Sequence, residues 1–502
     1  MRSFLVFVVV GTLGLLVGCG GSSTPHGVPV SISLNPTSAS INAGQTVPIT
    51  ATVANDPSNS GVNWSLSGVG TLTSVTSTSV TYEAPSSVTS NQVATVTATS
   101  AASSTVTSTL QITVLPSGAA TNVQPIHVDG GPVPNSIYPN GAFTDVTLCE
   151  PGTNTCQTIP GILVDTGSFG LRVLASAVTN ITLTAFNDGN GNDLNDCVQF
   201  ADQSFLWGTV APADIVLGGE IAGQIPNVHN TAVHLIANPT SYSIPVNCSN
   251  GGTNEDTQQT LGANGILGVG PAPVDCGFAC DPASGPPPEP FYYLCGTASG
   301  CAPVSVPCGE ACGGTPPNQQ LTNPVFNFPA DNNGVILELP SVSGVARSVD
   351  GNMIFGIGTA SNNGLGAAKV FTMDQNFNFT TQLSGKSPTS AFIDSGSNGL
   401  FFLDATTTGL PLCSDPSWYC PANTTNLSAV QTGTNNVTNT VNFSVDNFDN
   451  VTSGNPGDAA FGNLAGPFSG AFDWGLPFFY GRSVFTAIDG TNVGTPGPFW
   501  AY

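Results

Sequence analysis

The stretch Ile162-Leu163-Val164-Asp165-Thr166-Gly167-Ser168 (162–168) places one aspartate directly after an apolar run and before a turn of small residues. The apolar run predicts a buried β-strand, and the glycine predicts a tight turn that another backbone approaches closely. A second copy reads Phe392-Ile393-Asp394-Ser395-Gly396-Ser397 (392–397). Predicted strands resume at residues 171–174 and 400–403. We therefore expect two related lobes, each presenting one carboxylate at a turn.

If the lobes face each other, Asp165 and Asp394 can meet. Two carboxylates about 3 Å apart share a proton because both cannot be charged. One then acts as general base on a water molecule while its protonated partner donates to a carbonyl oxygen. This arrangement hydrolyses an amide without a metal or a covalent nucleophile. The alternative is that both aspartates lie in unrelated acidic turns of a chain rich in Ser, Thr and Gly.

The composition indicates a large, acidic, ordered protein. The chain has 502 residues, with 6 Lys+Arg against 30 Asp+Glu, and a formal net charge of −24. This length suggests two to four domains, and the charge argues against nucleic acid as a partner. Charged residues make up 7% and hydrophobic residues 40%, which excludes wholesale disorder. The scarcity of basic residues motivates the hypothesis that the fold tolerates acid.

The first 19 residues resemble the signal peptide of a bacterial lipoprotein. A basic Met1-Arg2 precedes an apolar core at 4–17, and Leu16-Val17-Gly18-Cys19 resembles a lipobox in which Cys19 becomes the lipidated N-terminus. Residues 20–27 would be a tether in the membrane-anchored protein. The residue after the cysteine, Gly20, favours the outer membrane or cell surface if the cell is diderm. An ordinary signal peptide and a transmembrane anchor are the alternatives, but the apolar core is shorter than the about 20 residues of a membrane span.

Residues 28–115 show short alternating runs separated by turn residues, a pattern typical of a β-sandwich. The segment resembles bacterial immunoglobulin-like domains, with Trp64 as the expected core aromatic residue. It contains no convincing cluster of ionisable groups, so we expect a spacer or adhesion module. Residues 116–125 are the expected linker.

The remaining region, 126–502, continues in short β-rich runs. After Asp165, residues 197–208 and 213–219 predict a strand, a polar tip and a returning strand, a hairpin able to fold over a cleft. An apolar pair followed by glycine occurs at Gly265-Ile266-Leu267-Gly268-Val269-Gly270. After Asp394 come Asp473-Trp474-Gly475 and a run ending at Ile488-Asp489.

This order of features resembles the pepsin-like aspartic peptidases. In that family a turn with the sequence Asp-Thr/Ser-Gly-Thr/Ser is followed by a flap hairpin and an apolar-apolar-Gly segment, and the set repeats in a second lobe. Ile266-Leu267-Gly268 corresponds to the apolar-apolar-Gly segment of the first lobe. In the second lobe, Trp474-Gly475 and the strand ending at Ile488-Asp489 correspond to it only loosely. The resemblance implies an all-β fold: the immunoglobulin-like sandwich, then a bilobal pepsin-like domain with lobes at 126–324 and 325–502. Residues 122–502 also resemble an uncharacterised bacterial lipoprotein family, a domain of unknown function.

The pepsin-like resemblance assigns roles to the residues of the two turns. It implies Asp165 and Asp394 as the catalytic pair, with support from Thr166, Gly167, Ser168, Ser395, Gly396 and Ser397. Ser168 and Ser397 would hydrogen-bond the carboxylates. Thr166 and Ser395 would brace the two turns against each other across the pseudo-twofold axis that relates the lobes.

Two positions depart from the pepsin-like pattern. The family's flap tyrosine and its partner tryptophan are replaced here by Phe200 and Arg172. Phe200 lacks the hydroxyl group, and an arginine near the aspartates would favour their charged form. Arg172 is alternatively a surface strand residue. Trp207 either supplies the missing aromatic contact or belongs to the core.

The cysteines predict disulfide bonds. Without Cys19, 12 of the 13 cysteines remain, an even number in an exported protein. Cys149/Cys156 and Cys413/Cys420 are expected local loop closures, and a Pro/Gly-rich stretch holds Cys276, Cys280, Cys295, Cys301, Cys308 and Cys312. The spacing of Cys276, Cys280, Cys308 and Cys312 leaves zinc as an alternative.

Oxygen-bearing residues alternate in the loop 188–196, which suits Ca²⁺. Asp188, Asn190, Asn192 and Asp196 are its candidate ligands. The loop lacks the glycine and glutamate of an EF-hand, so a solvated acidic turn is the alternative. No cofactor is required by the expected chemistry.

The sequence therefore predicts an exported lipoprotein that acts as an aspartic endopeptidase-like hydrolase on a polypeptide substrate. The alternatives are a catalytically inactive pepsin-like scaffold that binds a surface ligand, and a surface structural protein whose aspartates cap turns.

Overall fold

The computed structural model describes residues 29–502 except 37, 57, 87, 89–91, 116–121, 154, 224–230, 239–241, 285–290, 297–299 and 314–317. The expected signal peptide, the tether and Cys19 lie outside these residues. The chain divides into two compact units, one formed by Ser3–Ala119 and one that includes Ala120–Tyr502. Strands dominate both units, which confirms the all-β class.

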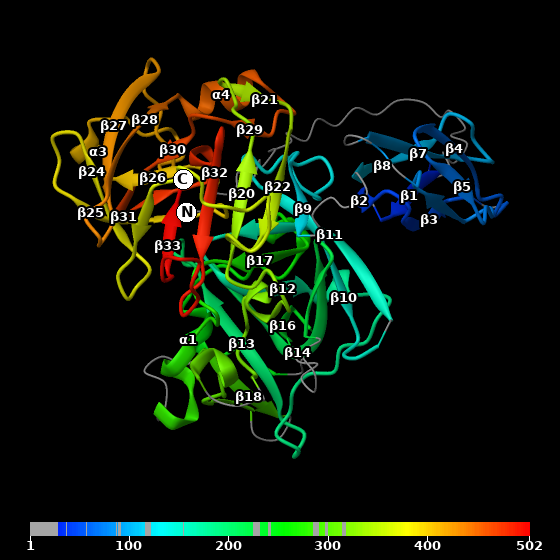
Figure 1. Cartoon of the computed structure of the whole chain (residues 1–502), viewed down its shortest axis with the longest axis horizontal. Helices are drawn as coiled ribbons and strands as arrows, with labels where there is room; N and C mark the ends of the chain where they lie inside the picture. The colour runs from blue at the N-terminus through cyan, green and yellow to red at the C-terminus, as the bar shows by residue number, and fades with distance from the viewer. Residues whose placement is uncertain are drawn as a thin grey trace, which may run out of the picture. The chain divides into compact units, whose positions relative to one another are not determined.

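The first unit (blue in Figure 1) consists of two four-stranded sheets around one core. One sheet has the order β1(Ser31–Asn35)-β3(Thr46–Ala54)-β6(Ser79–Glu83)-β5(Thr71–Thr73), and the other β2(Ser38–Asn42)-β8(Thr107–Leu115)-β7(Gln92–Ser100)-β4(Val62–Gly68). Alternate residues of β3 and β7 are buried, as expected for strands with one solvated face.

Tyr82, and not Trp64, is the central aromatic residue of this core. Tyr82 is fully buried, and its hydroxyl group donates to Val69 O at 2.9 Å. Trp64 is only partly buried, and its Nε1 donates to Thr76 O. Trp64 still packs against the core, but it stays partly exposed because its indole N–H needs a partner and that bond is solvent-exposed.

The second unit is built on a 16-stranded sheet. Its strand order is β19(Gly300–Pro303)-β18(Tyr292–Gly296)-β13(Asp193–Gln199)-β14(Phe205–Leu217)-β16(Thr231–Ile236)-β12(Phe169–Leu174)-β17(Gly265–Val269)-β11(Cys156–Asp165)-β10(Phe143–Cys149)-β9(Val123–Val128)-β22(Val349–Phe355)-β20(Gly334–Leu339)-β32(Arg482–Ala487)-β33(Phe499–Ala501)-β23(Val370–Thr372), with β15(Glu220–Ala222) paired to β14.

A seven-stranded sheet lies in the C-terminal half of this unit (Figure 1). Its order is β28(Thr438–Val445)-β27(Thr425–Thr432)-β24(Phe379–Leu383)-β25(Thr389–Ile393)-β31(Phe468–Trp474)-β26(Leu400–Leu403)-β30(Ala465–Gly466), and β21(Val345–Ala346) pairs β29(Ala460–Phe461) separately. The helices are short: α1(Val246–Ser249), α2(Gln258–Leu261), α3(Ala405–Thr408), α4(Phe448–Gly454) and the 3-10 turns η1(Ala175–Ala177), η2(Gly277–Cys280), η3(Pro282–Ser284), η4(Gly309–Cys312), η5(Pro324–Asn327) and η6(Leu476–Phe478). Among the described residues, no helix is long and apolar enough to cross a membrane.

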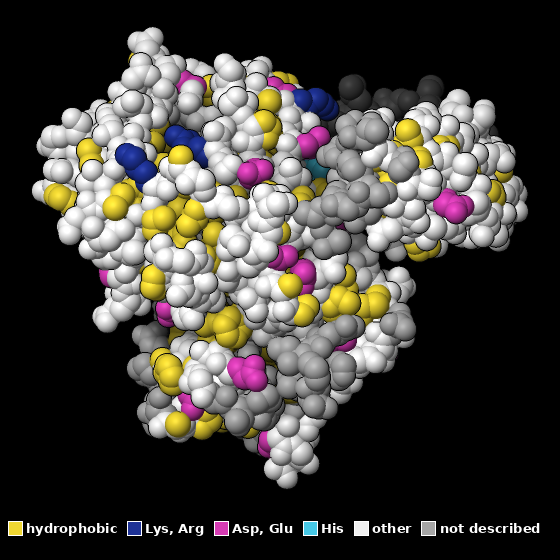
Figure 2. All heavy atoms as spheres, viewed as in Figure 1, with side chains coloured by type: hydrophobic (Ala, Val, Ile, Leu, Met, Phe, Trp, Pro, Cys, Tyr) yellow, Lys and Arg dark blue, Asp and Glu magenta, His cyan; other side chains and the backbone are white. Residues whose placement is uncertain are grey.

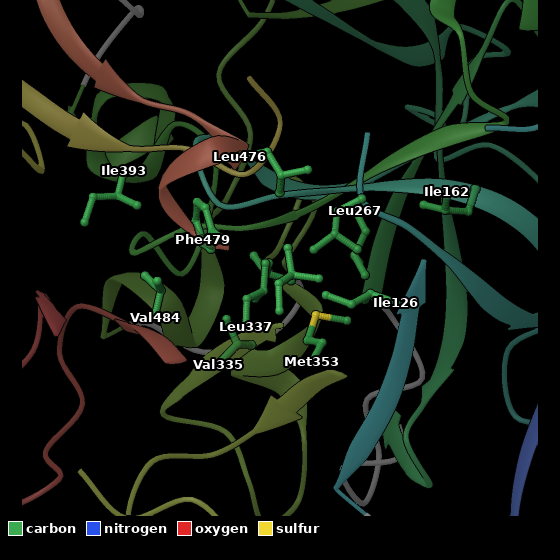
Figure 3. Packing of buried hydrophobic residues seen from close by; sticks show 14 of the residues in the cluster. Ile126, Ile162, Leu267, Val335, Leu337, Met353, Ile393, Leu476, Phe479 and Val484 are labelled. Atoms are coloured by element: carbon green, nitrogen blue, oxygen red, sulfur yellow. The ribbon is translucent and has the colours of Figure 1, made fainter. Parts of the chain in front are cut away.

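The two halves of the second unit share a sheet and a core. Strand β9 pairs antiparallel with β22, which joins the N-terminal strands to the C-terminal ones. The expected linker ends at residue 125, but β9 already begins at Val123. The boundary differs because β9 pairs with β22, a strand more than 200 residues away in sequence. Figure 3 shows the shared core, in which Ile162 and Leu267 from one half pack in the same cluster as Ile393 and Val484 from the other.

Six disulfide bonds connect the 12 remaining cysteines. The predicted pairs Cys149–Cys156 and Cys413–Cys420 are confirmed. The zinc alternative is wrong, because its four cysteines form the bonds Cys276–Cys280 and Cys308–Cys312. The other two bonds are Cys197–Cys248 and Cys295–Cys301. On the face shown in Figure 2, uncharged atoms predominate and Lys or Arg side chains are few, in keeping with the composition.

Candidate functional site

Each predicted aspartate turn lies in the same three-stranded motif. In the first copy β11 ends at Asp165, and both β11 and β12 pair with β17, which runs parallel to β11 and antiparallel to β12. In the second copy β25 and β26 pair with β31 in the same two senses. The register aligns Asp165 with Gly268, and Asp394 N donates to Trp474 O next to Gly475. Trp474-Gly475 therefore occupies the place of Leu267-Gly268, whereas Ile488-Asp489 follows β32 and lies outside the motif.

The glycine of each closing strand is needed because another backbone passes close by. A β-carbon on Gly268 would lie 2.5 Å from Phe169 N, and one on Gly475 would lie 2.0 Å from Gly399 O. Real β-carbon contacts are longer than this, so any side chain would push the turn away. The apolar-apolar-Gly pattern is thus a packing requirement of both turns.

The two aspartates face each other across the two halves. A β-carbon on Gly167 would lie 2.6 Å from Asp394 Cγ, and one on Gly396 would lie 2.7 Å from Asp165 Cγ. Each carboxyl group therefore rests against the glycine of the opposite turn. The two carboxyl groups lie within hydrogen-bonding reach of each other. The structure thus brings together the pair that the duplicated sequence predicts.

Each carboxyl group is also fixed by its own turn, in the same way on both sides. Gly167 N donates to Asp165 Oδ1 at 2.8 Å, and Ser168 Oγ donates to Asp165 Oδ2 at 2.6 Å. In the other half Gly396 N and Ser397 Oγ donate to Asp394 at 2.7 and 2.8 Å.

Thr166 and Ser395 brace the turns across the pseudo-twofold axis. Thr166 N donates to Ser395 Oγ at 3.1 Å, and Ser395 N donates to Thr166 Oγ1 at 2.9 Å. Their hydroxyl groups donate in turn to Ile393 O and Val164 O in the opposite strands. All four bonds are buried, so the relative position of the two turns is rigidly set.

Burial raises the pKa of Asp394 well above its ordinary value, and the charge of Asp165 raises it further. The charge of Asp473 and the hydrogen bond to Asp165 act in the same direction, while the hydrogen bond from Ser397 opposes them. Asp394 is therefore the member of the pair that retains a proton near neutral pH.

The predicted hairpin covers the pair. Strands β13 and β14 are joined by a tight turn in which Phe200 N donates to Ser204 O and Gln203 adopts φ of 71°. Val198–Asp202 line a cavity of about 290 Å³ together with Asp165 and Asp394. Trp207 belongs to the core instead: it is 4% exposed and packs edge-on against Tyr293 at 5.4 Å.

The covering hairpin is fastened on its outer side. The Cys197–Cys248 bond ties β13 to α1, and Gln199 Nε2 donates to Cys248 O. Strand β18 pairs along β13 as well. These contacts hold the strands of the hairpin in place close to its tip.

Arg172 is buried and is not a surface residue. It is 2% exposed and lines the cavity, with Nη1 donating to Phe169 O at 2.6 Å. Its Nε lies 3.6 Å from Asp196 Oδ2 and its Nη2 lies 3.5 Å from Asp275 Oδ2. Asp196 and Asp275, and not the two aspartates of the turns, are thus the carboxylates that lie beside its guanidinium group.

A buried ionisable network extends from Arg172, and of its members only Arg172 is singled out by the sequence pattern around the cleft. His234 Nδ1 lies 3.0 Å from Asp196 Oδ2, and neither side chain is exposed. Burial opposes the charged form of both groups. For His234 burial is the larger effect, and it lowers the pKa of the imidazole. For Asp196 the positive charges of His234 and Arg172 outweigh burial, so the pKa of the carboxyl group is lowered. Since Arg172 is a permanent cation, we assign the charge that balances Asp196 to Arg172 and regard His234 as neutral.

Asp275 is held from two sides. Tyr292 Oη donates to Asp275 Oδ1 at 2.7 Å and accepts from Leu321 N. Burial raises the pKa of Asp275 to about 7, repulsion from Asp196 adds to the shift, and Arg172 opposes it.

A third carboxylate, Asp473, was not assigned a role from the sequence. It lines the cavity and is 3% exposed. Its strand position in β31 corresponds to Ile266 in β17, because Phe392↔Asp473 repeats Leu163↔Ile266. Alignment of Asp473-Trp474-Gly475 with Ile266-Leu267-Gly268 would have revealed this polar residue at an apolar position.

The candidate calcium ligands do not form a shared site. Asp188 is exposed, and its carboxylate accepts hydrogen bonds from the backbone and side-chain nitrogens of Asn190 and Asn192, which describes a polar turn. Asp196 is fully buried beside Arg172. Within the part of the chain that the structure describes, one close group of possible metal donors occurs, Cys413, Cys420 and Asp449, but its cysteines are disulfide-bonded.

The buried carboxyl groups predict that the second unit is more stable in mild acid than in mild base. Burial raises the pKa of Asp473 to about 7, as it does for Asp275, from an ordinary value of 3.8. Between these values the native state holds more protons than the unfolded chain, so the free energy of unfolding falls as the pH rises. We expect Tm by calorimetry to be at least about 3 °C higher at about pH 5 than at about pH 8, the shift for roughly 1 kcal/mol in a large domain. Asp473→Asn should reduce this difference, and a Tm that rises with pH would contradict the assignment.

Comparison with known proteins adds a family and no activity. No curated protein matches the chain. One family model covers most of the second unit, including both aspartate turns, the covering hairpin and Asp473. With residues 118–502 matched, the chain belongs to the family described as protein of unknown function DUF3443.

Proposed function

We propose that this protein is an exported, lipid-anchored hydrolase that cleaves peptide bonds by the aspartic-peptidase mechanism. The duplicated three-stranded motif, the covering hairpin and the sheet common to both halves support a bilobal pepsin-like domain. The two packed sheets of the first unit support an immunoglobulin-like spacer. The observation that carries the proposal is the placement of each aspartate carboxyl group against the glycine of the opposite turn, within hydrogen-bonding reach of its counterpart.

The asymmetry of the pair assigns the two chemical roles. Asp394, whose pKa is raised, holds the proton, and Asp165 is the ionised general base. Asp165 takes a proton from water as the water oxygen bonds to the peptide carbonyl carbon, and Asp394 donates its proton to the carbonyl oxygen. The resulting diol returns one hydroxyl proton to Asp394 as the C–N bond breaks, and the proton held by Asp165 passes to the leaving nitrogen, which restores the starting state of the pair.

The surroundings suit a polypeptide segment. Aromatic side chains line the cavity on both sides of the pair, contributed by Phe169, Phe200, Phe291, Phe392 and Phe468. Apolar walls bind side chains of a substrate and exclude water, which strengthens the interactions within the site. The hairpin lies over the pair and is positioned to hold an extended peptide against it.

The direct test is hydrolysis of an unfolded protein by the full chain at about pH 3 to 7, with mass-spectrometric identification of the new ends. We expect cleavage that a statine-type inhibitor blocks, since its hydroxyl group takes the place of the attacking water. A wild-type protein that cleaves nothing over this range would favour the alternative of an inactive scaffold that binds a surface ligand.

The membrane anchor is tested separately. Cys19 lies outside the described residues, and the proposal for it rests on the lipobox-like sequence. Metabolic labelling with a fatty acid should label the wild type and not Cys19→Ser. Loss of membrane association in that variant, with hydrolysis retained, would separate the anchor from the chemistry.

A further inference from the structure

Asp473 is an uncommitted carboxylate inside the cavity. It is 3% exposed, and its Oδ1 is buried without a hydrogen-bond partner. The Ser397 hydroxyl group, which donates to Asp394 Oδ2, also lies within hydrogen-bonding reach of Asp473. A buried carboxylate oxygen without a donor is costly, so a ligand that supplies one gains binding free energy.

The fold itself does not require a carboxylate at this position. The duplicated motif has Ile266 at the corresponding place in β17, where it is fully buried in an apolar cluster. Both strands make the same parallel and antiparallel pairings around that residue. An aspartate in only one of two equivalent strands therefore indicates a role toward the cavity and not toward the sheet.

The surroundings of Asp473 suit a long cationic side chain. Phe392 and Phe468, both half-buried, line the cavity on the same half of the unit. Aromatic rings pack against the methylene groups of Lys or Arg and attract their charge.

The charge of the lining points to the same chemistry. The aspartates that line the cavity are Asp165, Asp202, Asp275, Asp394 and Asp473, against one cation, Arg172. Even with Asp394 protonated, and with Asp275 and Asp473 ionised only in part near pH 7, negative charge exceeds positive charge in this lining. Arg172 is already engaged by Asp196 and Asp275. A cationic group is therefore favoured in the cavity, while an acidic one is repelled.

We propose that Asp473, with Phe392 and Phe468, forms a subsite that binds a lysine or arginine side chain of the polypeptide next to the bond that is cleaved. The subsite deepens the proposed function and rests on it for the position of the scissile bond. The cation would donate to the free oxygen of Asp473 while its methylene groups lie between the two rings.

The test uses pairs of peptides, taken from cleavage sites found in an unfolded protein, that carry either lysine or the neutral isostere norleucine at a residue flanking the scissile bond. At one flanking position we expect the wild type to favour lysine by about 10- to 100-fold in kcat/KM, the range of a desolvated charge-assisted hydrogen bond. Asp473→Asn should bring this ratio close to 1, and Asp473→Ile, which copies Ile266, should favour norleucine. Asp489→Asn removes one charge from an exposed loop and should keep the wild-type ratio.

Binding of labelled peptides of random sequence that carry either lysine or norleucine, measured by fluorescence anisotropy, needs no known cleavage site and separates this inference from the hydrolase proposal. If peptides are cleaved without regard to lysine, the subsite is overturned and the hydrolase remains. If nothing is cleaved but lysine peptides bind more tightly, and Asp473→Asn removes the preference, the subsite remains and the hydrolase is overturned. Should Asp473→Asn fail to fold, equal wild-type affinities for the lysine and norleucine peptides still overturn the subsite.

Discussion

Replacement of Asp394 by asparagine is expected to lower kcat for peptide hydrolysis by about 10³-fold or more, since positioned acid–base groups contribute about 10² to 10⁴ each. Asparagine keeps the shape of the side chain: its Oδ1 can accept the hydrogen bond from Gly396 N, and its Nδ2 can donate to Ser397 Oγ once that hydroxyl group rotates. It cannot transfer a proton to the substrate carbonyl oxygen. The loss is measured as initial rates on a fluorogenic peptide, with equal concentrations of folded wild-type and variant protein.

The two aspartates should act as one unit. Asp165→Asn alone is expected to lose as much activity as Asp394→Asn, and the double variant should lose little more, because either change removes the shared proton or its acceptor. Additive losses would indicate independent roles and would count against a dyad.

Stability distinguishes this result from simple damage to the fold. Burial and the charge of Asp165 make the ionised form of Asp394 unfavourable, so a neutral asparagine should keep or raise Tm near neutral pH. The exposed Asp489→Asn serves as the matched control and should change neither Tm nor kcat. An inactive Asp394→Asn protein with a strongly lowered Tm would mean that the residue is structural.

The parts of the site that could be predicted from sequence are those fixed by local geometry. Asp165 and Asp394 follow buried strands and precede glycines that the opposite turn requires, so residue type and order carried the information. The hairpin at 197–208 was also predictable, because its strands and polar tip are contiguous in sequence. The same holds for Cys149–Cys156, in which the two cysteines close one short hairpin.

What could not be predicted depends on contacts between distant segments. The sequence does not decide whether Arg172 is a surface residue or a cleft residue, because the partners that bury it, Asp196 and Asp275, come from distant segments of the chain. Asp196 was assigned to a calcium loop because it follows Asp188 in sequence, yet strand β13 turns it into the interior. Periodicity identifies a strand but not which of its faces meets a charged residue from elsewhere.

Asp196→Ala is expected to destabilise the second unit by about 3 to 5 kcal/mol, the range for removing one partner of a buried ion pair. Arg172 and His234 would keep almost no contact with water, with side chains 3% and 0% exposed. Alanine would leave the guanidinium group facing Asp275 alone, and burial raises the pKa of that carboxyl group to about 7. The measurement is chemical denaturation at about pH 7, followed by near-UV circular dichroism.

The chain provides two internal controls for this experiment. Asp188→Ala removes a carboxylate a few residues away that only orders an exposed turn, so it should cost far less than Asp196→Ala, and added Ca²⁺ should stabilise neither protein. The first unit has a separate core with one tryptophan, Trp64, and should unfold at an unchanged midpoint. A shift of both transitions would show a general effect on the chain. If Asp196→Ala and Asp188→Ala lowered the free energy of unfolding equally, the buried network would stabilise the fold no more than a surface turn does. The short distances and the burial of Arg172, Asp196 and His234 predict the opposite result.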